Sequence, residues 1–128
     1  MKYYINKIVE LNFDTAIDKA IEELKKEGFG VLTEINVQET LKKKIDVDFM
    51  KYRILGACNP VYAHKALSLE DKIGVMLPCN IIVQEHDNGN VEVSAVNPKA
   101  SMMAIENPKL ESIANEIEIK LNRVVEAI

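Results

Sequence analysis

The chain has 128 residues and a formal net charge of −4, with 48% hydrophobic and 28% charged residues, as in an ordinary globular domain. The acidic balance argues against a nucleic-acid binder, whose surface is usually basic. No stretch approaches the roughly 20 apolar residues that cross a bilayer, and the first residues lack the apolar core of a secretory signal. We therefore expect one cytoplasmic domain over residues 1–128, with neither nucleic acid nor membrane as a partner.

A strand and a helix are expected at the start of the chain. Residues 3–11 are rich in β-branched and aromatic side chains, which favour a strand. The apolar residues of 13–24 recur with the 3.6-residue period of a helix. Asn12 or Asp14 can cap this helix, and Gly28 can end it in the left-handed conformation.

Two further strands and a polar connection follow. Residues 29–37 alternate between apolar and polar side chains, as a half-buried strand does, whereas the polar stretch 38–44 has room for a helical turn. Residues 51–58 predict a third strand. In this strand we expect one parity to face the core, namely Tyr52, Ile54, Gly56 and Cys58.

The second half of the chain predicts a helix, a hairpin and a long final helix. The first of these helices runs from Pro60 to about Leu67, and residues 69–72 have room for a short second turn. The fourth strand starts with the inward residues Cys79, Ile81 and Val83, and Asp87-Asn88-Gly89-Asn90 is typical of a hairpin turn before a fifth strand at 91–95. The final helix begins at Asn107-Pro108 and carries an apolar stripe from Leu110 to Ile128. The order βαββαββα predicts an α+β fold, an antiparallel sheet with helices packed on one face.

Each of the two cysteines is followed by asparagine, in "GACNP" (56–60) and "LPCN" (77–80). One interpretation is architectural: Asn59 caps the helix that Pro60 opens, and the cysteines act as small apolar residues. The other is a shared site, because Cys58 ends one strand and Cys79 begins the next, so that the sulfurs approach each other if these strands are antiparallel neighbours. The residues alone leave both interpretations open.

Other polar residues bear on the shared site. A cysteine just before a helix N-terminus, like Cys58, has its thiolate favoured by the helix dipole. Asn80 has no helix to cap and asparagine is depleted in strand interiors, which suggests a buried polar contact or a group offered to a ligand. His64 on the helix after Cys58 is a base or ligand, or simply a half-exposed histidine. Met102 and Met103 offer soft ligands for Cu(I) or serve packing. Because the cysteines lack CxxC spacing, we assign no metal site and no catalytic residue.

Three stretches resemble a known family: "YRILGACNPVYAHKAL" (52–67), "IGVMLPCNIIVQE" (73–85) and "VNPKASMM" (96–103). Over nearly its whole length the chain is similar to the bacterial and archaeal family called domain of unknown function 302. The resemblance implies a small α+β domain that is commonly a homodimer. Because the family has no agreed activity, no catalytic residue and no cofactor carry over. The resemblance only marks signature positions, which are Cys58, Asn59, Pro60, Pro78, Cys79 and Asn80.

We expect a small-ligand-binding or regulatory module, in which asparagine amides donate and accept hydrogen bonds and thiols form a mildly polar floor. The ligand-binding candidates are Cys58, Asn59, Cys79, Asn80 and His64. One alternative is a thiol-based redox or soft-metal-handling protein, with Cys58 as nucleophile or ligand and Cys79 as its partner. Another is a dimeric interaction domain without a small-molecule site. The sequence does not decide whether any reaction is catalysed.

Apolar residues on the second face of the sheet predict a homodimer. Leu32, Ile82 and Val96 each have the parity opposite to the inward residues of their strands. A sheet covered by helices on one face should show water a polar second face. An apolar patch there usually marks an interface, most often between two copies of one chain. The competing account is that another segment of the same chain covers this face.

Overall fold

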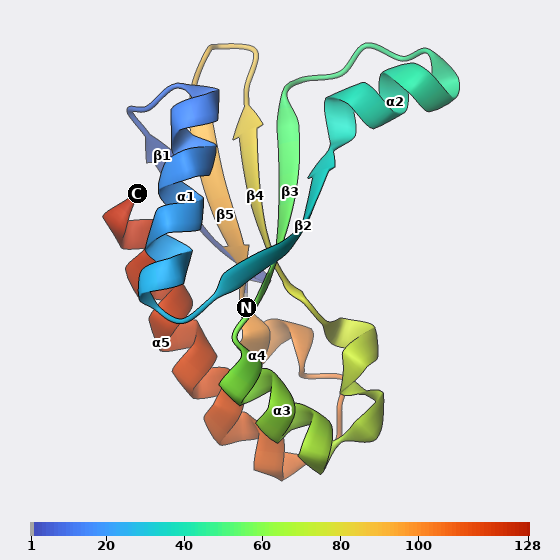
Figure 1. Cartoon of the computed structure of the whole chain (residues 1–128), viewed down its shortest axis with the longest axis vertical. Helices are drawn as coiled ribbons and strands as arrows, with labels where there is room; N and C mark the ends of the chain where they lie inside the picture. Colours follow the sequence, from blue (N-terminus) through green and yellow to red (C-terminus); the bar gives the residue numbers. More distant parts are fainter. Residues whose placement is uncertain (1) are drawn as a thin grey trace.

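The computed structural model describes residues 2–128 and contains one five-stranded sheet in the order β1-β5-β4-β3-β2 (Figure 1). Every neighbouring pair of strands is antiparallel. The α+β class and the antiparallel sheet expected from the sequence are therefore confirmed. The strands are β1 (Tyr4–Val9), β2 (Gly30–Asn36), β3 (Tyr52–Cys58), β4 (Cys79–Glu85) and β5 (Val91–Val96).

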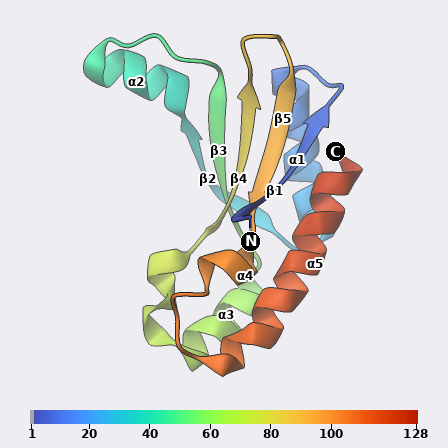
Figure 2. The same cartoon turned by 180° about the vertical axis from the view of Figure 1, so that it is seen from behind.

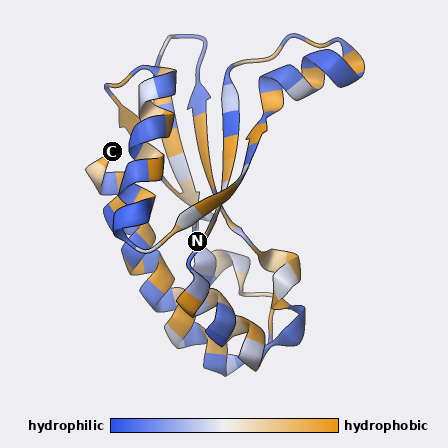
Figure 3. Cartoon of the chain, viewed as in Figure 1, coloured by the Kyte–Doolittle hydropathy of each residue, from blue (hydrophilic) through white to orange (hydrophobic). Residues whose placement is uncertain are grey.

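Two long helices, α1 (Phe13–Lys26) and α5 (Glu111–Ala127), cover one face of the sheet (Figure 1). Figure 3 shows mainly hydrophilic residues on the outward surface of α1. Asn12 caps α1, because its Oδ1 accepts the backbone N–H of Thr15 at 2.8 Å, and Gly28 adopts a φ of 86° after the helix. Between helices and sheet lies the core, whose fully buried members include Leu24, Leu55, Ile81, Val93 and Leu121. No helix among residues 2–128 combines the length and apolarity needed to span a membrane.

A second group of helices lies beyond one end of the sheet, against the N-terminal half of α5 (Figure 1). Two of its helices start with an Asn-Pro pair whose asparagine caps the helix: α4 (Pro98–Ser101) and the 3₁₀ turn η2 (Pro108–Leu110). In both cases the asparagine Oδ1 accepts a backbone N–H at 3.1 Å, so these caps are real. The other members are α3 (Pro60–Leu69) and the 3₁₀ turn η1 (Asp71–Met76).

The polar stretch after β2 forms a full helix, α2 (Val37–Ile45), where the sequence left room for a single turn. Asn36 caps it by accepting the backbone N–H of Glu39 at 3.0 Å, and Glu39 pairs with Lys43 one turn further on. None of its residues is buried, and it projects from the sheet (Figure 1). The helix thus depends on local polar interactions, which an apolar period does not reveal.

The expected orientation of β3 is wrong. Leu55 and Ala57 face the helices, because they pair directly with the inward residues Ile81 and Cys79 of β4. Tyr52, Ile54 and Gly56 therefore lie on the opposite face. The charge of Arg53 made its side of the strand look outward. Arg53 does have the inward parity, but it lies at the end of the sheet, where it pairs with Glu34 and lies over the ring of Phe13.

No helix covers the second face of the sheet among the described residues, as the view from behind shows (Figure 2). Ile82 and Val96 lie on this open face as expected, beside Tyr52 and Asn80. Leu32 does not belong to it. A β-bulge shifts the register between Val31 and Thr33 and leaves Leu32 without a partner in β3.

Candidate functional site

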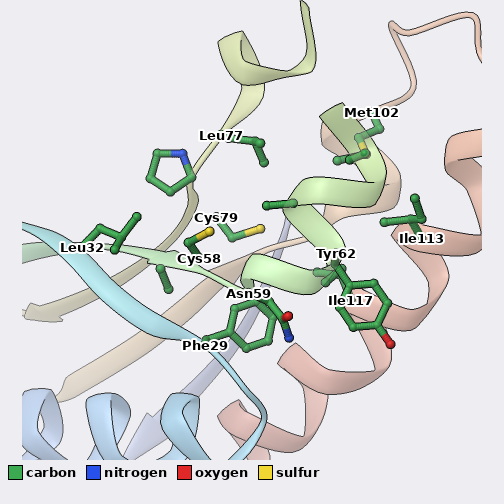
Figure 4. A pocket seen from close by; sticks show the side chains of 14 residues that line it. Phe29, Leu32, Cys58, Asn59, Tyr62, Leu77, Cys79, Met102, Ile113 and Ile117 are labelled. Atoms are coloured by element: carbon green, nitrogen blue, oxygen red, sulfur yellow. The ribbon is translucent and has the colours of Figure 1, made fainter. Parts of the chain in front are cut away.

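An apolar cavity of about 260 Å³ lies where the ends of β2, β3 and β4 meet the second group of helices (Figure 4). Large side chains from four parts of the chain form most of its wall: Phe29, Leu77, Met102, Ile113 and Ile117. Small residues of β3 and α3 leave the space open between them. None of the described residues that line the cavity carries a charge. Such a wall favours apolar groups over ions.

Both cysteines line this cavity, and their side chains point into it (Figure 4). Ala57 is the partner of Cys79 across the sheet, so strict alternation would send Cys58 to the other face. Cys58, however, is the last residue of β3, where the chain leaves the sheet for α3, and alternation ends there. Both are free thiols. Burial, and then the neighbouring Cys58, raise the pKa of Cys79 to about 11, so this thiol is neutral at physiological pH.

Asn59 lines the cavity but does not cap α3, and the architectural interpretation of this residue is wrong in that respect. Its Nδ2 donates instead to the backbone carbonyl of Glu27 at 3.3 Å, and its side chain lies against Gly28. Asn59 therefore ties the start of α3 to the turn after α1. With only 8% of its surface exposed, it is one of the few buried polar residues of the described chain.

Asn80 and His64, the two remaining candidates, lie elsewhere. Asn80 is on the open face, because it pairs across the sheet with Gly56, and it borders a separate hollow with Tyr52 and Ile82. His64 borders a surface hollow between α3 and α5. The structure thus brings together Cys58, Asn59 and Cys79, and separates them from the other two.

Tyr62 was not among the residues expected at the site, yet its ring forms part of the cavity wall (Figure 4). The neighbouring Glu116 side chain on α5, and then burial, raise the pKa of the Tyr62 hydroxyl. The ammonium groups of Lys65 and Lys120 lie 5.3 and 5.8 Å from the centre of the ring. These charges are therefore grouped around Tyr62, whereas the cavity wall itself has none. No sequence signal marked Tyr62 as part of this wall.

Leu32 is a further residue of the cavity that sequence reasoning assigned elsewhere. The bulge re-aims its side chain, as bulges beside functional sites often do. It is 68% exposed, a high value for a leucine, and it borders the cavity, so the cavity opens to solvent at this residue. A bound molecule would cover this exposed apolar surface.

The donor set for a metal ion is small. Within residues 2–128, no three His, Cys, Asp or Glu side chains gather as potential ligands. The sulfur atoms of Cys58, Cys79 and Met102 border the same cavity, but a thiol whose pKa is about 11 must lose its proton before it binds a metal.

Fold and cavity define a small antiparallel α+β domain with an apolar chamber between its sheet and its second group of helices. The model of the family "Domain of unknown function DUF302" matches residues 5–128, and the chain belongs to this family. It is similar to the uncharacterized conserved protein DUF302 from Bacillus stearothermophilus, with 30% sequence identity and a TM-score of 0.93 over 99% of this chain and 98% of that one. The curated proteins include no match.

Proposed function

We propose that this protein is a binding module for a small molecule, which it holds in the cavity beside Cys58, Asn59 and Cys79. The observation that carries the proposal is the chamber itself: about 260 Å³ of apolar space with a buried amide and two thiols at its wall. Ligand sites in proteins are typically concave and mainly apolar, with few polar groups that fix orientation. The proposal also explains part of the doubled Cys-Asn pattern, because three of its four residues border the same cavity.

A binding role is favoured over thiol chemistry by the state of Cys79. The thiolate is the reactive form of cysteine, and burial disfavours it here. A neutral thiol instead provides a soft, weakly polar surface. Cys79 then shapes the chamber, and no reaction is needed to explain it.

A pair of phenylalanine substitutions on α3 tests this proposal. Ala63 borders the cavity, whereas Val61 on the same helix does not and is 61% exposed. A library of uncharged small molecules is screened by thermal shift against the wild type, Ala63→Phe and Val61→Phe. We expect compounds that raise the melting temperature of the wild type and of Val61→Phe, and not that of Ala63→Phe. If the same compounds stabilise all three proteins equally, they bind elsewhere and the proposal is wrong.

We infer, as a separate property, that two copies associate through the open face of the sheet. Ile35, Ile54 and Ile82 pair with one another in register and form an apolar row across β2, β3 and β4. No segment of the described chain packs over this row, and Ile35 is 47% exposed (Figure 2). A second copy, which carries the same row, is a matching partner for it.

Light scattering at micromolar concentration tests this assembly. We expect twice the mass of the 14.4 kDa chain for the wild type. Ile82→Lys should give the monomer mass with an unchanged circular dichroism spectrum, whereas Ile119→Lys, on an exposed position of α5, should leave the dimer intact. A monomeric wild type would contradict the dimer, and a dimeric Ile82→Lys variant would contradict the choice of surface.

A further inference from the structure

The shape and chemistry of the cavity narrow the class of its ligand, and this inference rests on the proposed binding function. We infer that the ligand is an uncharged, mainly hydrocarbon molecule about the size of a bicyclic aromatic ring. We further infer that it carries one hydrogen-bond donor, which meets the Oδ1 atom of Asn59. Size, charge and the free hydrogen-bonding capacity of the wall support this class separately.

The volume of the cavity sets the size. A dry protein cavity of about 150 Å³ binds one molecule of benzene. By proportion, about 260 Å³ suits a ligand with on the order of ten non-hydrogen atoms. A bicyclic ring fits this space, which is too small to enclose a nucleotide.

The wall sets the charge. An ion that enters an apolar cavity loses its hydration, and this loss is costly unless an opposite charge compensates for it. None of the described residues of the wall supplies such a charge, and the neutral Cys79 thiol adds none at physiological pH. Charged molecules of the right size are therefore excluded by desolvation, and uncharged ones are admitted.

Asn59 sets the polar contact. Its Nδ2 is occupied by the carbonyl of Glu27, and this nitrogen is the atom of the amide closest to Gly28. No hydrogen bond within residues 2–128 uses its Oδ1, which leaves an acceptor on a residue that borders the cavity. A ligand that brings one N–H or O–H to this oxygen gains a hydrogen bond in a mainly apolar site, and such polar contacts orient ligands.

Leu32 supplies the remaining contact. The bulge holds this side chain at the open side of the cavity, with 68% of its surface exposed. A ligand in the cavity buries part of that surface, and its affinity increases accordingly. Asn59 thus orients the ligand, whereas Leu32 covers it at the open side of the cavity.

Binding of four probes, measured by isothermal titration calorimetry, tests the class. Indole and indene have the same shape, but only indole carries an N–H donor. Benzoate and benzylammonium are aromatic ions of similar size. We expect indole to bind several-fold more tightly than indene, although indene is the more apolar molecule, and we expect neither ion to bind. Tighter binding of indene would overturn the donor contact, and binding of either ion would overturn the uncharged class.

Two leucine variants test the position of the bound probe. Leu32→Ala should weaken indole binding several-fold, whereas Leu67→Ala, at an exposed position of α3 that does not border the cavity, should leave it unchanged. An equal effect of both substitutions would contradict closure by Leu32. If the four probes fail but library compounds stabilise the wild type and not Ala63→Phe, the ligand class is wrong and the binding function stands. If no compound discriminates between those two proteins, both proposals fail.

Discussion

A side chain at Gly56 is expected to destabilise the fold, although this residue lies in a strand with an ordinary backbone conformation. A Cβ atom added to Gly56 would lie 2.2 Å from the Thr33 hydroxyl and 2.9 Å from Cγ of Pro78, and 3.4 Å is an ordinary contact. The hydroxyl would have to retreat by roughly 1 Å, and the proline ring by about half as much. Overpacking of this kind costs typically about 1–3 kcal/mol. We therefore expect Gly56→Ala to reduce the free energy of unfolding by that amount.

The two contacts can be separated by a second substitution. Thr33→Ala removes the hydroxyl and leaves only Pro78 in the way, since the Cβ of Thr33 is already 3.6 Å from the new atom. The double variant should thus recover part of the stability that Gly56→Ala loses, a coupling that urea denaturation measures through a double-mutant cycle. Gly30→Ala is the control, because its Cβ would meet nothing within 4 Å. A Gly56→Ala protein as stable as the wild type, or strictly additive effects, would refute this reasoning.

Two further predictions concern the polar residues of the cavity. Asn59→Ala should lower the free energy of unfolding by about 1 kcal/mol, because the hydrogen bond to the Glu27 carbonyl is lost. Hydrogen exchange at the first turn of α3 should stay as in the wild type. Selective fraying of that turn would instead indicate that Asn59 is a cap. Because the pKa of Cys79 is higher in the folded chain than in the unfolded one, its contribution to stability is fully present below about pH 9 and is lost as the pH rises through about 11. Between pH 8 and pH 11, the free energy of unfolding should therefore fall by about 2–3 kcal/mol more in the wild type than in Cys79→Ala, as denaturation at the two pH values measures. An equal fall in the two proteins would contradict the raised pKa.

Regular elements of this fold can be predicted from local chemistry. The helical period of residues 13–24 and the Asn-Gly hairpin turn each depend on neighbours in the sequence, and both predictions hold. The helical start at Asn107-Pro108 also follows from local chemistry, and Asn107 caps it as Asn97 caps α4. The sequence predicts the common location of the two cysteines only on the condition that their strands are antiparallel neighbours, and β3 and β4 meet this condition.

The parts that could not be predicted depend on contacts between distant segments. Asn59 has the same Asn-Pro context as the two true caps, yet its amide bonds to Glu27, 32 residues away in the chain. The charge of Arg53 is tolerated on the inward parity because Glu34 and the ring of Phe13 lie beside it at the end of the sheet. The bulge that moves Leu32 from the open face to the cavity leaves no mark in the alternation of β2.

A methyl NMR titration with indole tests the central claim, that the cavity binds a small uncharged molecule. Alanine and methionine methyl groups are labelled, since Ala57, Ala63 and Met102 border the cavity and Ala16 and Ala20 are buried away from it in α1. The account predicts saturable shifts of the first three signals and unchanged positions of the last two. An absence of saturable shifts at the three cavity methyl groups would contradict it.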